Sequence, residues 1–284
     1  MVKEYTKELA DACARHKKLV VIFTSVLLAL CVVGMVVATF VDLRLSQALN
    51  DPNQGYSKFL HDYGEWTAYF INVGFGIGLS VWLIKCKRYF WAIIPFLFAI
   101  VFGSFFSLMW LENTSMPVLF NTLFNMVCVG VFFCFFFFAK DEFHKKALYI
   151  LGVTFIITNF VYIIMLALKY LWGRVRFWDL ADNFTAWYRP NGINGHQSFP
   201  SGHVLSAAST LMLWLVPIIF KIKNPFARAT LIILPILYTL SMMYARIVVG
   251  AHYLSDVVFS ILLLTVCTVI FLWIIFRRVN KKGR

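Results

Sequence analysis

Charged residues are scarce in this sequence of 284 residues, because only 14% are Asp, Glu, Lys or Arg while 61% are hydrophobic. A soluble domain carries about a quarter charged residues. The apolar residues form long runs rather than short amphipathic stripes. The shortage of charge therefore excludes an ordinary soluble globular protein and predicts an integral membrane protein.

A disulfide framework is also lacking, although the chain has six cysteines. Four lie inside apolar runs and two lie beside clusters of Lys and Arg, so we expect all six to be reduced. Residues 1–18 are polar, and no small-residue cleavage site clearly follows the first apolar run. We expect that run to be retained as a membrane span rather than removed as part of a signal peptide.

Long apolar runs dominate the rest of the chain. About 20 apolar residues are needed to cross the core of a bilayer. The sequence predicts eight spans, at 19–41, 66–84, 92–110, 117–139, 147–168, 204–220, 229–245 and 254–276. We expect an all-α, polytopic transmembrane helix bundle in two parts, with the N-terminal tail and first four spans in 1–146 and the last four spans in 147–284. A turn signal at 50–53 follows a short stretch that we expect to lie along the interface as an amphipathic helix.

The distribution of positive charge assigns a side to each loop. With a cytoplasmic N-terminus and alternating spans, 19 of the 26 Lys and Arg residues face the cytoplasm and seven face outward. Of the 13 acidic residues, five face inward and eight face outward. This asymmetry satisfies the positive-inside rule, with both termini cytoplasmic. The net charge of +13 is thereby explained by cytoplasmic loops, so we expect a membrane rather than a nucleic acid as partner.

Three polar clusters lie at the outward mouths of the last four spans. In the first, Lys169 and Arg176 are seven residues apart, or two helical turns, so we expect them on one helix face as two cations for a phosphate. In the second, Ser201 is a candidate helix N-cap and Gly202 lets a ligand approach the backbone. The free N–H groups of a helix N-terminus favour an anion.

The second and third clusters also contain the residues with acid–base chemistry. His252 and Asp256 are four residues apart, hence neighbours if that stretch is helical. A carboxylate bonded to one imidazole nitrogen fixes the tautomer and leaves the other nitrogen free to attack. His203 provides a second histidine, and Arg246 ends a span on the side that has few positive charges. Each cluster alone also fits a structural role, but all three structural interpretations would have to hold together.

The clusters resemble the three-part signature of the type 2 phosphatidic acid phosphatase superfamily, and in particular its bacterial membrane lipid phosphatases. The first family motif is Lys, six residues, Arg and Pro. Lys169 and Arg176 match it, but Phe177 replaces the proline. The second motif, Pro-Ser-Gly-His, is complete at 200–203.

The third family motif is Ser-Arg, five residues, His, three residues and Asp. Arg246, His252 and Asp256 match it, but Ala245 replaces the serine. The resemblance covers about the last 120 residues and leaves 1–146 without a family assignment. Phe177 and Ala245 put two positions around the phosphate site in doubt.

The resemblance implies a mechanism that agrees with the residue chemistry. It implies that His252 attacks phosphorus to form a phosphohistidine while Asp256 orients the ring. His203 would protonate the leaving oxygen and then activate water. The implied phosphate-binding groups are Lys169, Arg176, Ser201, Gly202 and Arg246. No cofactor or metal is implied, and no His, Cys or Asp cluster has the spacing of metal ligands.

We therefore predict a membrane phosphatase that hydrolyses a lipid phosphomonoester or diphosphate on the outer face, in a bacterial cell membrane. Undecaprenyl diphosphate, phosphatidylglycerol phosphate and phosphatidic acid are the candidate substrates. Two alternatives share the same site: a lipid phosphotransferase, and a non-catalytic membrane protein, such as a transporter, that binds an anion or lipid. Transporters often carry inverted repeats and broken midplane helices, and neither is evident here. His61, Arg189 and His196 fit no spacing rule and receive no role.

Overall fold

The computed structural model describes residues 2–15, 17–113, 118–181 and 184–281. Its helices are α1 (Val2–Arg15), α2 (Lys17–Leu49), α3 (Gly55–Tyr63), α4 (Trp66–Lys85), α5 (Tyr89–Asn113), α6 (Val118–Phe138), α7 (Asp141–Trp172), η1 (Phe177–Asp179), α8 (Gly202–Ser209), η2 (Thr210–Trp214), α9 (Leu215–Ile219), α10 (Pro225–Val248) and α11 (Leu254–Lys281), where η marks a 3₁₀ helix. Those residue ranges contain no β-strand. The all-α prediction is confirmed.

The chain divides into two compact units. The first comprises Met1–Tyr5 and Trp66–Ile156, and the second comprises Thr6–Glu65 and Ile157–Arg284. Helix α7 contributes its first half to one unit and its second half to the other. The predicted division at 146 stays a prediction, since the compact units group residues by contact rather than by motif.

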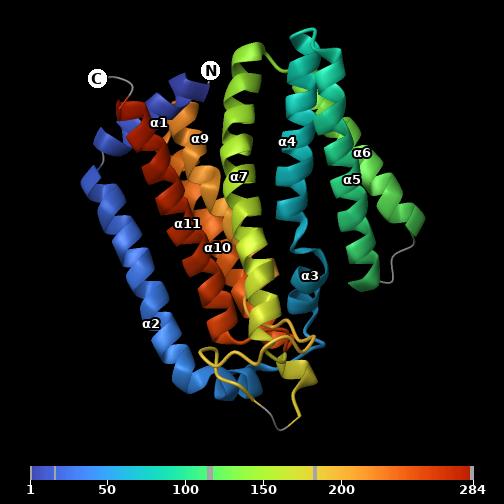
Figure 1. The fold of residues 1–284 in the computed structure, drawn as a ribbon, viewed down its shortest axis with the longest axis vertical. Helices are drawn as coiled ribbons and strands as arrows, with labels where there is room; N and C mark the ends of the chain where they lie inside the picture. The colour runs from blue at the N-terminus through green and yellow to red at the C-terminus, as the bar shows by residue number, and fades with distance from the viewer. Residues whose placement is uncertain (1, 16, 114–117, 182–183, 282–284) are drawn as a thin grey trace. The chain divides into compact units, whose positions relative to one another are not determined.

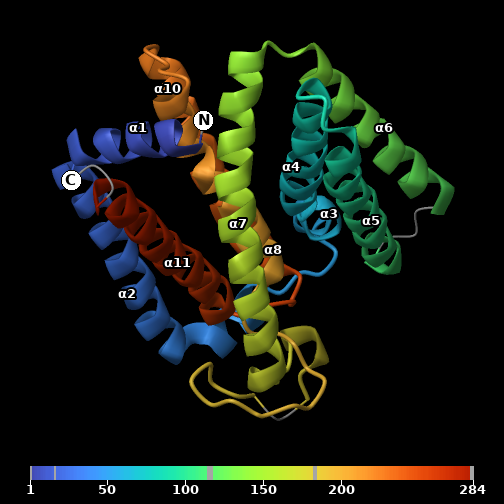
Figure 2. The ribbon, with the colours of Figure 1, turned by 45° about the horizontal axis from the view of Figure 1, so that its top comes forward.

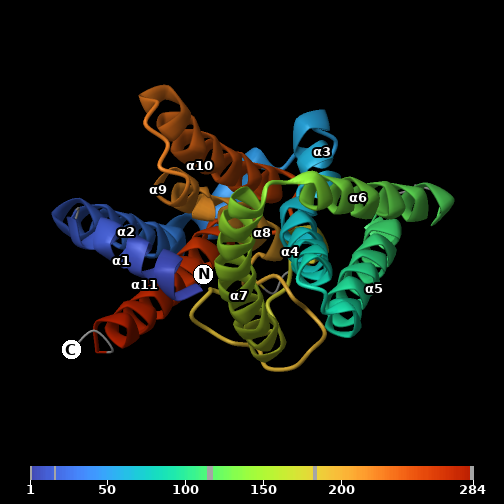
Figure 3. The same cartoon turned by 90° about the horizontal axis from the view of Figure 1, so that it is seen from above.

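The first unit is built around α4, α5 and α6, which pack against one another (Figure 3). Their buried core consists of Tyr69, Val73, Ile77, Val81, Ala99, Val129 and Phe136. Helices α4 and α5 approach closely at Gly76, where an added Cβ would lie 2.8 Å from the backbone oxygen of Pro95. Small residues at such crossings allow the close backbone packing that holds membrane helices together.

The second unit contains the last three predicted spans and the second half of α7, together with α2 and α3. Helix α2 runs beside α11 (Figure 1), and α10 contacts both α3 and α8. Helix α8 also packs on α11. The described parts of the long loop, 173–181 and 184–201, gather where α7 finishes (Figure 2). This arrangement brings the C-terminal end of α7 and the first turns of α8 and α11 to the same end of the unit.

The composition of the helices identifies an integral membrane protein. In the part of the chain that the structure describes, six segments are long and apolar enough to cross a bilayer: Val20–Leu49, Gly55–Lys85, Asp141–Asp179, Gly202–Ile219, Pro225–Val248 and Leu254–Arg277. Two shorter apolar helical stretches are Tyr89–Ser104 and Thr122–Phe138. These eight segments follow the order of the eight predicted spans. The number that actually crosses, and the side on which each terminus lies, stay predictions.

Helix boundaries differ from the predicted spans where polar residues continue or interrupt a helix. Helix α2 runs without a break to Leu49, so the predicted interfacial helix before 50–53 is the end of α2 itself. Helix α3 follows directly and was not predicted, because it is short and amphipathic. The sixth predicted span is irregular, since α8 gives way to η2 and α9, and Pro217 removes a backbone donor inside α9.

Candidate active site

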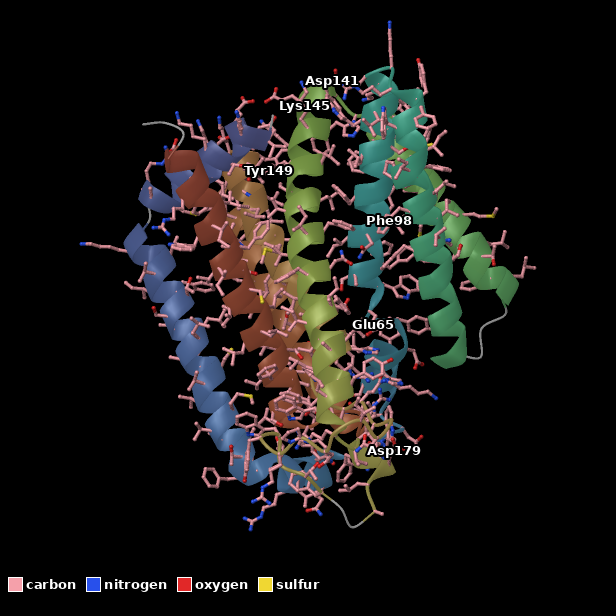
Figure 4. All side chains as sticks on the ribbon, in the orientation of Figure 1. Glu65, Phe98, Asp141, Lys145, Tyr149 and Asp179 are labelled. Atoms are coloured by element: carbon pink, nitrogen blue, oxygen red, sulfur yellow. The ribbon has the colours of Figure 1, made fainter. Side chains whose placement is uncertain are left out.

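The eight predicted site residues all lie in the second unit, around the end of α7 and the starts of α8 and α11. Figure 4 labels Glu65, directly after α3, and Asp179, in η1. The local structure of each segment determines which side chains meet.

His252 lies in the tight turn between α10 and α11. Gly250 has φ +74°, a left-handed conformation that glycine adopts without strain. The backbone N–H groups of Ala251 and His252 both donate to the carbonyl oxygen of Arg246, each at 3.1 Å. His252 itself precedes the helix that carries Asp256, because α11 begins at Leu254.

The turn nevertheless brings His252 against Asp256. Its Nδ1 lies 3.5 Å from Asp256 Oδ2, a contact without hydrogen-bond alignment, and Nδ1 has no other partner. Its Nε2 has no hydrogen bond to any residue that the structure describes. Burial lowers the pKa of His252 well below its ordinary value, and the nearby Arg246 and Lys169 lower that pKa further while Asp256 raises it. His252 is therefore a neutral imidazole at physiological pH, with a lone pair available on one nitrogen.

Asp256 is fully buried and held by three donors. Ser198 Oγ donates to its Oδ2 at 2.6 Å, and the backbone N–H of Tyr253 donates to the same oxygen at 3.0 Å. Arg174 Nη1 donates to Oδ1 at 2.5 Å. These contacts fix the carboxylate in the first turn of α11, where the helix N-terminus also favours a negative charge.

Arg174 connects this carboxylate to a second one on α2. The Arg174 side chain is 1% exposed, and its Nη2 donates to Asp42 Oδ2 at 2.9 Å. Asp42 also accepts from Ser255, through the backbone N–H at 2.9 Å and the hydroxyl at 2.5 Å. The spacing rules assigned no role to Arg174 or Asp42. An acidic residue at the end of the first apolar run was the signal that could have found Asp42, because ionisable residues at such positions are often functional.

Lys169, Arg176 and Arg246 form a group that we call the cation cluster. The three lie close enough to interact electrostatically. Among the residues that the structure describes, none of the three has a carboxylate within ion-pair distance. Buried cations without a carboxylate partner are suited to binding an anion.

Each member of the cation cluster has its own support. Lys169 Nζ donates to the carbonyl of Gln197 at 2.7 Å. Arg246 is 2% exposed and bonds to His61 Nδ1 through Nη1, while its Nε is buried without a partner. Arg176 packs over Trp178, with its guanidinium carbon 5.0 Å from the ring centre. An unpartnered buried guanidinium N–H is a donor available to a bound anion.

The prediction that Lys169 and Arg176 project from one helix face is wrong. Helix α7 ends at Trp172, and Gly173 has φ +53°. An added Cβ at Gly173 would lie 2.0 Å from the carbonyl oxygen of Gly192, so only glycine fits this turn. Arg176 therefore reaches the cluster from an extended segment, at the N-cap position of η1.

The prediction that Ser201 caps a helix is confirmed. Its hydroxyl accepts from the backbone N–H of Val204 at 3.5 Å, and its own N–H donates to the carbonyl oxygen of Asp256 at 3.2 Å. The first turn of α8 is thereby attached to the first turn of α11. A Cβ at Gly202 would lie 3.5 Å from Glu65 Oε1 and from Met165 Sδ, which is ordinary van der Waals contact. The neighbouring side chains therefore leave room for a methyl group at this position.

His203 has a partner at each ring nitrogen, and both partners come from the chain around α3. Its Nδ1 lies 2.8 Å from Glu65 Oε1, and its Nε2 lies 3.0 Å from the backbone oxygen of His61. The rings of His61 and His203 stack with an interplanar angle of 5°. No spacing rule indicated His61 or Glu65, which are more than 130 residues away from His203 in the sequence.

The two departures from the family motifs lie at the start of η1 and near the end of α10. Phe177 begins η1, and its ring meets the edge of Tyr253, next to His252, with centroids 6.3 Å apart. The following N–H, of Trp178, donates to the carbonyl of Gly250 at 3.0 Å. Phe177 thus packs on the turn that carries His252. Ala245 is fully buried near the end of α10.

Residues 145–281 match the family model of the PAP2 superfamily. This region contains all eight predicted site residues, and its match confirms the superfamily that the motif resemblance predicted. No curated protein and no solved structure matches the chain. Membership indicates a phosphatase that acts on a phosphorylated substrate at the membrane. Asp42, His61 and Glu65 lie outside the matched region, and assignment to the bacterial branch stays a prediction.

Proposed function

We propose that the protein hydrolyses a phosphomonoester or diphosphate carried by a membrane lipid, through a phosphohistidine on His252. The observation that carries the proposal is the pairing of a buried neutral imidazole with Asp256 beside three cations that have no carboxylate partner. A phosphoryl group carries up to two negative charges. A nucleophile, its orienting acid and a cationic binding site are the parts that covalent phosphoryl transfer requires.

In the first step, His252 Nε2 attacks phosphorus while Asp256 faces Nδ1 and stabilises the developing positive charge on the ring. The bond from phosphorus to the leaving oxygen breaks, and His203 gives that oxygen a proton. Lys169, Arg176 and Arg246 stabilise the charge on the equatorial oxygens, together with the N–H groups at the start of α8.

In the second step, His203 takes a proton from water and the resulting hydroxide attacks the phosphohistidine. The nitrogen–phosphorus bond breaks, inorganic phosphate leaves and His252 is restored. Transfer to a lipid or sugar hydroxyl in place of water would make the same site a phosphotransferase. Analysis of the products from a labelled donor separates these two outcomes.

The choice of a lipid substrate is supported by the position of the site at the ends of apolar helices. Undecaprenyl diphosphate, phosphatidylglycerol phosphate and phosphatidic acid present a phosphate at that depth. The test is phosphate release from each lipid in detergent by wild type, His252→Ala and His196→Ala. His196 is an exposed histidine of the same outer loop and serves as the matched control.

We expect His252→Ala to abolish release and His196→Ala to retain it. A phosphohistidine is acid-labile and stable in alkali, so an alkaline denaturing quench should trap it in wild type and in His196→Ala. Equal release by wild type and His252→Ala would refute the nucleophile. Binding of the lipids without release by any variant would favour the non-catalytic alternative.

We also propose that the site faces away from the cytoplasm, which the Lys and Arg distribution supports. Ile193 is 80% exposed in the outer loop, and Cys86 is exposed in a loop predicted to be cytoplasmic. In intact cells, a membrane-impermeant maleimide should label Ile193→Cys in a Cys86→Ser background. The same reagent should label Cys86 of wild type only after permeabilisation. The reverse pattern would invert the topology.

A further inference from the structure

We propose that Glu65 is the positioning residue of the acid–base histidine, His203. This inference rests on the proposed phosphatase function and deepens it. Glu65 Oε1 lies 2.8 Å from His203 Nδ1. A carboxylate at one imidazole nitrogen holds a proton there and fixes which nitrogen exchanges protons with the substrate. Glu65 would therefore assign the catalytic proton to Nε2.

The second contact of His203 shows where that proton rests. Its Nε2 lies 3.0 Å from the backbone oxygen of His61, and a carbonyl oxygen only accepts hydrogen bonds. Glu65 and His61 together thus face His203 with two acceptors, which are both satisfied when both nitrogens carry a proton. A histidine in that state is prepared to protonate a leaving oxygen. When Nε2 gives up its proton, the Nδ1 proton remains on the side of Glu65.

The backbone that carries Glu65 is fixed independently of its carboxylate. The hydroxyl of Ser206, in the same helix as His203, donates to the carbonyl oxygen of Glu65 at 3.1 Å. The hydroxyl of Tyr238 donates to the carbonyl oxygen of Gly64 at 2.7 Å. These bonds attach the end of the α3 segment to α8 and α10. The charge of Glu65 can consequently be removed while two anchors of its backbone remain.

The site then contains two histidine–carboxylate pairs with different tasks. Asp256 faces His252, which acts as a neutral nucleophile, and Glu65 faces His203, which gives and takes a proton. Asp256 lies within the region that matches the family model, whereas Glu65 lies outside it. The chain before residue 145 therefore supplies a functional group to the site rather than only a membrane anchor.

The test compares two phosphate monoesters that carry the same alkyl chain but differ in leaving group. One is an alkyl phosphate, whose alkoxide needs a proton in order to leave. The other is a nitrophenyl phosphate with the chain on its ring, whose phenolate leaves without one. Glu65→Gln keeps the size and one acceptor oxygen but removes the charge. We measure kcat/KM, which reports the steps through the first cleavage of the phosphorus–oxygen bond.

For Glu65→Gln we expect kcat/KM to fall about a hundredfold on the alkyl ester, at the low end of what general acid catalysis contributes. The loss on the nitrophenyl ester should be much smaller. His203→Ala should show the same selectivity with a larger loss. Tyr238→Phe removes an anchor of the same segment without touching the carboxylate, and it should affect both esters equally.

A loss of equal size on both esters in Glu65→Gln would overturn the proposal, since it would show a structural role only. If Glu65→Gln does not fold, Glu65→Asp retains the charge and shortens its reach, and it should show a weaker selective loss. An equal loss in that variant would overturn the proposal as well. Failure of the phosphatase function has a different signature, because wild type would then release phosphate from neither ester.

Discussion

The buried contact between Arg174 and Asp42 predicts a large and specific effect on stability. Arg174→Met leaves Asp42 and Asp256 buried without their shared cation. Removing one partner of a buried ion pair costs about 3–5 kcal/mol. Asp42→Asn alone should cost less, because Arg174 keeps Asp256 and the amide keeps an acceptor. The double variant loses the contact between Arg174 and Asp42 only once. Its destabilisation should therefore be smaller than the sum of the two single effects by about 1 kcal/mol or more.

The assay is the thermal unfolding midpoint of the purified protein in detergent micelles. With about 2–4 °C of shift per kcal/mol, Arg174→Met should lower the midpoint by on the order of 10 °C. Arg189→Met is the matched control, since Arg189 is an exposed arginine of the same loop that packs over Tyr188. A midpoint shift in the double variant equal to the sum of the shifts of Arg174→Met and Asp42→Asn would show that the two residues are not coupled. Equal destabilisation by Arg189→Met and Arg174→Met would show that the buried contact is not the cause.

Three further predictions concern the chemistry of the site. Burial, Arg246 and Lys169 lower the pKa of His252, so its unprotonated form persists as the pH falls. The rate of phosphohistidine formation, measured by rapid quench, should therefore stay constant below about pH 6.5, the ordinary histidine pKa. A rate that falls at or above that pH would contradict this expectation. Arg246→Lys keeps the charge but loses the two-pronged donor, and kcat/KM should fall about a hundredfold; an unchanged value would show that charge alone suffices. In Gly202→Ala the new Cβ meets only ordinary contacts at 3.5 Å, so the unfolding midpoint should stay unchanged while KM rises; an unchanged KM would exclude close approach of the substrate at this backbone position.

Much of the helical fold could be predicted because a membrane span is a local property of the sequence. A run of apolar residues must satisfy its own backbone hydrogen bonds in lipid, which leaves the helix as the available local structure. The ends of the helices were harder to predict. Apolar content does not determine where α7 stops, whereas Gly173, with its positive φ and the backbone of Gly192 close to it, follows the end of the helix directly.

The site residues also differ in whether a local pattern in the sequence predicts them. The motif residues could be predicted because their chemistry repeats at fixed short spacing, as in His252 and Asp256. The spacing was informative even where the assumed helix was absent, since the turn at Gly250 brings the same two side chains together. Asp42 lies 213 residues from Ser255, and no local pattern encodes such a contact.

The distribution of charge in the site explains why these distant residues are needed. Asp42 and Asp256 share Arg174, and Glu65 is paired with His203. The ion pairs of these three carboxylates are thus made with Arg174 and His203 rather than with Lys169, Arg176 or Arg246. Pairing these carboxylates with Arg174 and His203 leaves the cation cluster without a carboxylate at ion-pair distance among the described residues, which suits it to a phosphate. Residues 145–281 contain the predicted phosphate-binding groups but not Asp42 and Glu65. A sequence comparison limited to that region would therefore omit two of the acids that pair with Arg174 and His203.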